Sequence, residues 1–186
     1  MEMMTKTHPV VIYCMYFPVI AFMLYYGVAK KGVSVGLEAL LFVSGILFWS
    51  FFEYLMHRYL FHMVVEKPRA KKFIYTMHGV HHEYPRDKER LFMPPVPSLI
   101  VACILFSIMY FLMSWKALSF FPGFLFGYIA YGSMHFAIHA FAPPKFLKAL
   151  WRNHHLHHYK APEKGFGVSS VLWDVVFNTV PKKEEI

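Results

Sequence analysis

The sequence predicts an all-α integral membrane protein, in which four transmembrane helices carry a helical cap. Three observations lead to this fold class. Hydrophobic residues make up 57% and aromatic residues 19% of the 186 positions, which is high for a soluble domain of this length. Four long apolar stretches run along the chain, and histidines at helical spacing lie in or beside the polar segments that follow them. A single domain over residues 1–186 is the simplest organisation.

Each apolar stretch is long enough to cross a hydrocarbon core, which requires about 20 helical residues. The first stretch is too long for the core of a signal peptide and no small-residue cleavage pattern follows it, so we expect it to be retained. Cys14 and Cys103 lie within apolar stretches at no metal-binding spacing and are expected to be buried packing residues. The four predicted spans are about Val10–Val28, Val35–Phe52, Leu99–Trp115 and Phe121–Ala140.

The basic residues predict the orientation of these spans. One lysine precedes the first span, eight lysines and arginines lie between the second and third, and seven follow the fourth. The other side has only Lys30, Lys31 and Lys116. The positive-inside rule therefore places both termini and the large central connection in the cytosol. That connection, about His57–Pro97, is too polar to cross a membrane and is expected to fold as a cytosolic helical cap, in a multi-pass protein of the endoplasmic reticulum or a bacterial inner membrane.

The net charge of +8 does not indicate nucleic-acid binding, because the basic residues form neither a continuous stripe nor a known binding motif. In the cap they have two other interpretations. They attract an acidic redox partner or lipid headgroups, or they only set the topology. The residues concerned are Arg58, Lys71, Lys72, Arg86, Lys88 and Arg90.

Eleven of the twelve histidines fall into four motifs, HRYLFH, HGVHH, HFAIH and HHLHH. Residues at i, i+3 and i+4 share a helical face, so His78, His81 and His82 are expected to converge on one point. The same holds for His154, His157 and His158, and for the i, i+4 pair His135 and His139. His57 and His62 differ, because five residues turn a regular helix by about 140°. That pair requires a distorted turn, a helix end or two different metals.

A lone histidine on an apolar face is usually a hydrogen-bonded core residue, and an i, i+4 pair within a span can join two helices. Two HxxHH motifs and two further pairs at one membrane face instead favour metal binding, since imidazole is the commonest metal ligand. A metal takes about four to six ligands, so ten or eleven histidines indicate two metals. Zinc has no redox chemistry. A lipid tail has no hydrolysable bond, and cleaving its C–H bonds requires a metal that activates oxygen, so iron is favoured.

The four motifs, in this order, resemble the fatty acid hydroxylase superfamily of membrane di-metal enzymes. The stretches FFEYLMHRYLFHMVV, MHGVHHEYPRDKERLFMPPVPS, HFAIH, HHLHHY and GFGVSSVLWDVVFNTVP resemble the catalytic domain of fatty acid (sphingolipid) 2-hydroxylases over about residues 45–181. Histidine motifs recur across the superfamily. The more discriminating segments are RLFMPPVP and GFGVSS followed by LWD.

The resemblance implies ten metal ligands and leaves out His8 and His155. Glu53 and Asp174 are expected to accept hydrogen bonds from ligand imidazoles. Tyr54, Tyr59, Tyr84 and Tyr159 are expected to be interfacial belt residues. The implied ligands are His57, His62, His78, His81, His82, His135, His139, His154, His157 and His158.

The implied reaction is oxygen-dependent hydroxylation of C2 of a fatty acyl chain, in a free lipid or a sphingolipid, with O2 as co-substrate and two iron ions that zinc can replace in purified protein. No haem domain is recognised in the sequence, so two electrons are expected from a separate cytochrome b-type or ferredoxin-like protein. Two alternatives remain. One is a sterol or carotenoid hydroxylase or desaturase of the same superfamily, and the other is a non-enzymatic membrane zinc-binding protein.

Overall fold

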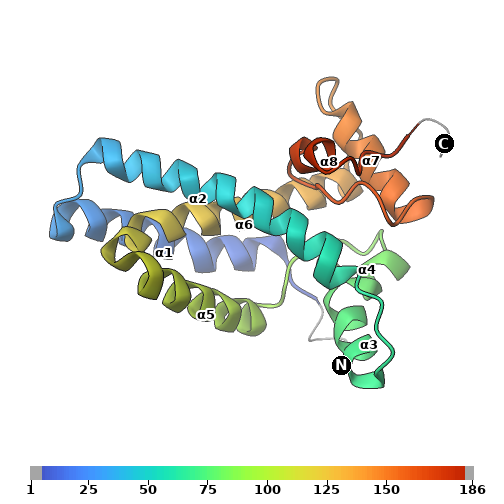
Figure 1. Ribbon diagram of the computed structural model, residues 1–186, viewed down its shortest axis with the longest axis horizontal. Helices are drawn as coiled ribbons and strands as arrows, with labels where there is room; N and C mark the ends of the chain where they lie inside the picture. Colours follow the sequence, from blue (N-terminus) through green and yellow to red (C-terminus); the bar gives the residue numbers. More distant parts are fainter. Residues whose placement is uncertain (1–5, 183–186) are drawn as a thin grey trace.

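The computed structural model describes residues 6–182, and within that range all regular structure is helical. Four long helices lie side by side along the longest axis of the molecule, and the shorter helices gather at one end of them (Figure 1). The long helices are α1 (Pro9–Lys31), α2 (Val35–Leu55), α5 (Pro95–Met113) and α6 (Ala117–Ala140). The described chain begins and ends at the cap end (Figure 1).

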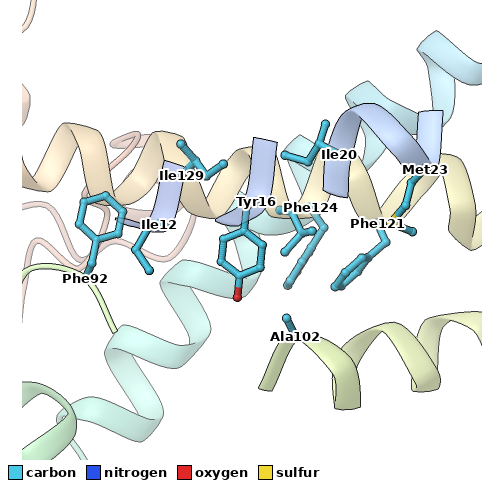
Figure 2. Packing of buried hydrophobic residues seen from close by; sticks show 10 residues of the cluster. Ile12, Tyr16, Ile20, Met23, Phe92, Ala102, Phe121, Phe124 and Ile129 are labelled. Carbon is cyan, nitrogen blue, oxygen red and sulfur yellow. The ribbon is translucent and has the colours of Figure 1, made fainter. Parts of the chain in front are cut away.

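The core of the bundle lies between α1, α5 and α6 (Figure 2). On α1 the buried face repeats with helical periodicity, through Ile12, Tyr16 and Ile20. These side chains meet Phe121 and Phe124 of α6, which are also almost fully buried. The outward faces of the same helices carry large exposed apolar side chains, which is the pattern of a bundle that lipid surrounds.

The helices α2 and α6 approach each other until their backbones touch. A Cβ atom on Gly45 would lie 2.1 Å from the carbonyl oxygen of Phe120, and one on Gly123 would lie 1.9 Å from that of Phe42. Small residues allow such close crossings where membrane helices pack. The crossing fixes the relative positions of the two helix ends that continue into the cap.

Three helical stretches are long and apolar enough to cross a membrane, namely Pro9–Lys31, Val35–Phe61 and Lys88–Ala140. The third contains both α5 and α6, which are joined by the 3₁₀ turn η5 (Ser114–Lys116). At this turn Ser114 has a φ of 54°, and α6 then folds back so that Phe121 packs on Phe106 of α5. A helix covers nearly all of each predicted span, although α5 ends at Met113, before the predicted end at Trp115. That all four helices cross a membrane stays a prediction.

The cap is built from short helices and turns. The segments of the central connection are the π-turn η2 (Met56–Phe61), α3 (Pro68–Ile74), the π-turn η3 (Tyr75–Gly79), α4 (Val80–Glu83) and the 3₁₀ turn η4 (Lys88–Arg90). After α6 the chain adds α7 (Lys148–Tyr159) and α8 (Leu172–Val176). The residues before α1 also contact the cap, because the Thr7 amide donates a hydrogen bond to the Glu89 carbonyl at 2.7 Å.

The prediction for the two cysteines is wrong. Cys14 on α1 and Cys103 on α5 are both exposed. Apolar stretches that cross a membrane present part of their surface to lipid, so an apolar surrounding sequence does not by itself predict burial inside the protein.

Candidate di-metal centre

The first histidine pair lies where α2 changes its helical form. From Met56 the helix continues as the π-turn η2, in which hydrogen bonds connect residues five apart. His57 and His62 are therefore brought to the same side, with ring centroids 5.2 Å apart. Two of the predicted explanations therefore hold together, since the turn is distorted and His62 lies just past its end at Phe61. Binding to two different metals is not needed to explain the spacing of this pair.

The structure gathers all ten predicted ligands at the cap end of the bundle, in two groups of five. Within each group, one nitrogen from every imidazole lies within 4.8 Å of the others. The first histidine group consists of His57, His62, His78, His82 and His157. The second histidine group consists of His81, His135, His139, His154 and His158.

Each HxxHH motif contributes to both groups, so the expectation that its three histidines converge on one point is wrong. His78 and His82 belong to the first group, whereas His81 between them faces the second. Successive helical residues point about 100° apart, so two adjacent histidines cannot face the same centre. The two groups lie next to each other, because the rings of His82 and His158 stack with centroids 4.2 Å apart.

The nitrogen atoms within each group have the spacing of ligands around one ion. In the first group, His78 Nε2 lies 3.0 Å from His57 Nε2 and 2.9 Å from His82 Nε2. In the second, His154 Nε2 lies 2.9 Å from His139 Nε2 and 3.1 Å from His158 Nε2. Two nitrogens bound at right angles about 2.1 Å from one metal would be about 3.0 Å apart.

Hydrogen bonds between the imidazoles do not account for this geometry. A single N–H on His78 Nε2 could serve one of its two neighbours, but not both. Further ring nitrogens in the two groups are buried without a hydrogen-bond partner among the described residues, including Nε2 of His62, His135 and His157. Because orphaned buried nitrogens are costly, the donor set fits two cations.

Burial also keeps the cap histidines in the form that binds metals. It lowers the pKa of His82 to about 4 and that of His157 to about 3, and repulsion from neighbouring histidines adds to the effect. The pKa of His78 is lowered in the same way. These side chains are therefore neutral at physiological pH, with a lone pair available to a metal.

Residues 42–179 match the family model described as fatty acid hydroxylase, which is most of the chain. This chain belongs to the fatty acid hydroxylase family. Similar curated proteins of the family include the ceramide very long chain fatty acid hydroxylase SCS7 of Saccharomyces cerevisiae, 37% identical over 96% of this chain and 47% of the yeast protein. The dihydroceramide fatty acyl 2-hydroxylase FAH2 of Arabidopsis thaliana is 35% identical over 97% of this chain and 76% of the plant protein.

The mouse fatty acid 2-hydroxylase is 38% identical over 77% of this chain and 40% of its own length. Among solved structures, that of full-length scs7p, in which only the hydroxylase domain is visible, matches with a TM-score of 0.91 and 34% identity. That match covers 97% of this chain and 69% of the other. The chain spans about half or less of the yeast and mouse relatives, and about three quarters of FAH2.

The candidate metal centre includes a segment to which the sequence alone assigned no role. After α7, the segment from Lys164 to Ser169 passes beside the first histidine group. The Phe166 carbonyl accepts a hydrogen bond from His57 Nδ1 at 2.6 Å, and the Lys164 carbonyl accepts one from His157 Nδ1 at 2.7 Å. Because a carbonyl only accepts, both imidazoles carry their proton on Nδ1, and Nε2 is left free to bind a metal.

The predicted role of the two carboxylates is wrong in its details. Neither has a histidine among its hydrogen-bond partners in the described part of the chain. Glu53 instead accepts hydrogen bonds from the amides of Val168 and Ser169, and Asp174 accepts them from the amides of Phe166 and Gly167. Both side chains are buried and bind the backbone segment that contacts the histidines.

Two other sets of predicted residues have different outcomes. His155 is exposed and outside both groups, and exposed His8 caps α1, accepting a hydrogen bond from the Val10 amide at 3.3 Å. Tyr54 is fully buried, so its prediction as a belt residue is wrong; its hydroxyl pairs with Thr179 at 2.9 Å. The other three predicted belt residues, Tyr59, Tyr84 and Tyr159, are exposed.

Proposed function

We propose that this chain is a membrane di-iron oxygenase that hydroxylates C2 of a fatty acyl chain, with the acyl chains of sphingolipids as the favoured substrates. The observation that supports this most directly is the pair of adjacent five-nitrogen groups, in a chain whose relatives are named as ceramide hydroxylases and fatty acid 2-hydroxylases. Those names favour acyl chains over sterols or carotenoids.

In this proposal each histidine group holds one metal ion. The five imidazoles of a group would hold the ion, and imidazole nitrogen is a donor that suits iron as well as zinc. When bound, the iron pair supplies the oxygen activation that breaking an unactivated C–H bond requires. Zinc is expected to occupy both sites after aerobic purification, because imidazole sites bind it more tightly than ferrous iron.

The surroundings of the first group support a dry reaction site. The Phe166 ring packs against His57, His62 and His157, with centroids 5.5 to 5.7 Å away. The carbonyls of Lys164 and Phe166 hold two of these imidazoles by Nδ1 and so orient them. Such packing excludes water from the histidines and keeps their Nε2 atoms directed at one point.

The proposed topology has four spans with the cap and both termini in the cytosol, in the endoplasmic reticulum or a bacterial inner membrane. Because His57 follows α2 and His135 and His139 lie in the last turns of α6, this topology puts the metal centre at the membrane surface, where an acyl chain can reach it from the bilayer. The electrons come from a cytochrome b-type or ferredoxin-like protein. Exposed Lys71 and Lys72 on α3 are suited to attract its acidic surface.

The test is lipid analysis of cells that lack their own 2-hydroxylase and express this protein with a reductase system. We expect 2-hydroxy acyl chains to accumulate in sphingolipids. His81→Ala and His157→Ala remove a ligand from the second and the first group, and each should abolish the product. His155→Ala changes an exposed histidine of the same motif and should leave it unchanged.

Two results would contradict the proposal. One is a folded, metal-loaded protein that produces no 2-hydroxy acyl chains, or that hydroxylates sterols instead. The other is full product formation by His81→Ala or His157→Ala. Protein levels and membrane insertion of each variant, measured by immunoblot of the membrane fraction, show whether a loss of product reflects the chemistry.

A further inference from the structure

The segment GFGVSS and the aspartate of LWD, which resemble the 2-hydroxylase branch in sequence, form one hydrogen-bonded unit beside the first histidine group. Asp174 of α8 binds the amides of Phe166 and Gly167 at 3.0 and 2.8 Å. Glu53 at the end of α2 binds the amides of Val168 and Ser169 at 2.8 and 2.9 Å and also accepts the Ser169 hydroxyl. Four consecutive amides are thus held by two buried carboxylates.

The glycines of the motif are needed for this approach. Gly165 has a φ of +70°, a backbone conformation that residues other than glycine rarely adopt. A Cβ on Gly167 would lie 2.1 Å from the Ser170 carbonyl oxygen and 2.8 Å from Asp174 Oδ2. The segment can therefore wrap closely around the carboxylate only with glycine at this position.

The same segment presents its carbonyls to the metal centre. The amide of Phe166 is bound by Asp174, while its carbonyl accepts the Nδ1 proton of His57. Thr179 extends the unit, since its hydroxyl donates to Asp174 at 2.7 Å and pairs with Tyr54. A displacement of the segment would therefore change the orientation of His57 and His157.

The second histidine group has no such support. The buried Nδ1 atoms of His81, His135, His154 and His158 have no hydrogen-bond partner among residues 6–182. The segment 164–169 makes its two imidazole hydrogen bonds only to members of the first group. The carboxylates consequently act on one side of the metal centre.

We infer that Glu53 and Asp174 are positioning residues for the first metal alone: they clamp the segment 164–169, whose carbonyls fix the tautomer and direction of His57 and His157. The inference rests on the proposed role of the histidine groups as two metal sites. Outer hydrogen bonds of this kind typically change metal affinity by about 10- to 100-fold when removed.

Replacing each carboxylate by the corresponding amide is expected to have a different effect at the two positions. Both amides that Glu53 binds meet the same oxygen, and its other oxygen meets a hydroxyl that is able to reverse its hydrogen bond. Glu53→Gln is therefore expected to preserve the clamp, whereas Glu53→Ala removes it. In Asp174 both oxygens face backbone N–H groups, so Asp174→Asn places an amide nitrogen against a donor and breaks it.

The experiment is metal analysis of the purified full chain after anaerobic loading with ferrous iron and removal of loose metal. The wild type and Glu53→Gln should each hold two ions per chain. Glu53→Ala and Asp174→Asn should lose about one of the two. Glu163→Gln, which removes an exposed carboxylate just before the segment, is the matched control and should retain both.

Retention of two ions by Glu53→Ala and Asp174→Asn would overturn the inference, as would loss of both ions from a variant that still unfolds cooperatively. If Asp174→Asn does not fold, the comparison of Glu53→Ala with Glu53→Gln decides, and equal loss in both refutes the acceptor role. Metal counts do not depend on turnover. A wild type with two ions but no hydroxylase activity would contradict the proposed function and leave the positioning role intact.

Discussion

Gly123→Ala should destabilise the bundle although it adds a single methyl group. The new Cβ would lie 1.9 Å from the Phe42 carbonyl oxygen, about 1.5 Å short of the 3.4 Å at which ordinary contact begins. The obstacle is the backbone of α2, which cannot move aside as a side chain does. The helices must separate instead, and overpacking of this kind costs about 1–3 kcal/mol. For a chain of this size the midpoint of thermal unfolding should fall by about 3–10 °C.

Gly36→Ala is the matched control, because it makes the same chemical change where a Cβ would have no atom within 4 Å. In a helix, alanine is favoured over glycine by up to about 1 kcal/mol, so this variant should be as stable as the wild type or slightly more so. The assay is thermal unfolding of detergent-purified protein followed by circular dichroism. A Gly123→Ala midpoint equal to or above that of Gly36→Ala would refute the backbone contact between α2 and α6.

Three further predictions concern the metal centre. His157→Ala and His158→Ala, neighbours in one motif, should each weaken a different site, so each variant should lose about one of two ions while the double variant loses both; His155→Ala should lose none. In metal-free protein, burial lowers the folded-state pKa of His157 to about 3, below its ordinary value of 6.5, so protons favour the unfolded state. The contribution of His157 to the free energy of unfolding should therefore be fully present above about pH 7. It should decrease as the pH drops through 6.5, by about 2 kcal/mol at pH 5. A free energy of unfolding, measured with denaturant, that stays constant between pH 7 and 5 would contradict the burial of His157. Removing metal with a chelator should lower the midpoint of thermal unfolding, since an ion whose free concentration is 100 times its Kd stabilises the folded state by about 2.7 kcal/mol. An unchanged midpoint would argue against ion binding.

The helical content and the identity of the clustered histidines were predictable because both depend on local patterns. Apolar stretches of about 20 residues fold as helices wherever water is excluded, since no other local structure satisfies their backbone groups. A helix covers nearly all of every predicted span. The helices α5 and α6 begin at Pro95 and Ala117, a few residues before the predicted starts, and α5 ends at Met113. The prolines and the turn at Ser114 determine these ends.

Local periodicity failed where the helix departed from its regular form or where two faces of one helix were both occupied. The π-turn η2 brought His57 and His62 together at a spacing that a regular helix does not allow. His81 faced the second group because α6 and α7 pack on that side of α4 and supply its partners, His135 and His158. The spacing of residues along a helix gives the angle between their side chains, but it does not show which residues pack against each face.

The sequence by itself determined which side chains are available: apolar helices, ten histidines at one end of them, and a glycine-rich segment followed by an aspartate. Only the tertiary structure decided how these were used. It divided the histidines into two groups and directed Glu53 and Asp174 to backbone amides rather than to imidazoles. The division of the histidines depends on contacts between distant segments, such as that of His57 with His157, and Glu53 meets Val168 of a segment far along the chain. Asp174 meets nearby amides, but no local pattern encodes which buried donor a carboxylate will meet.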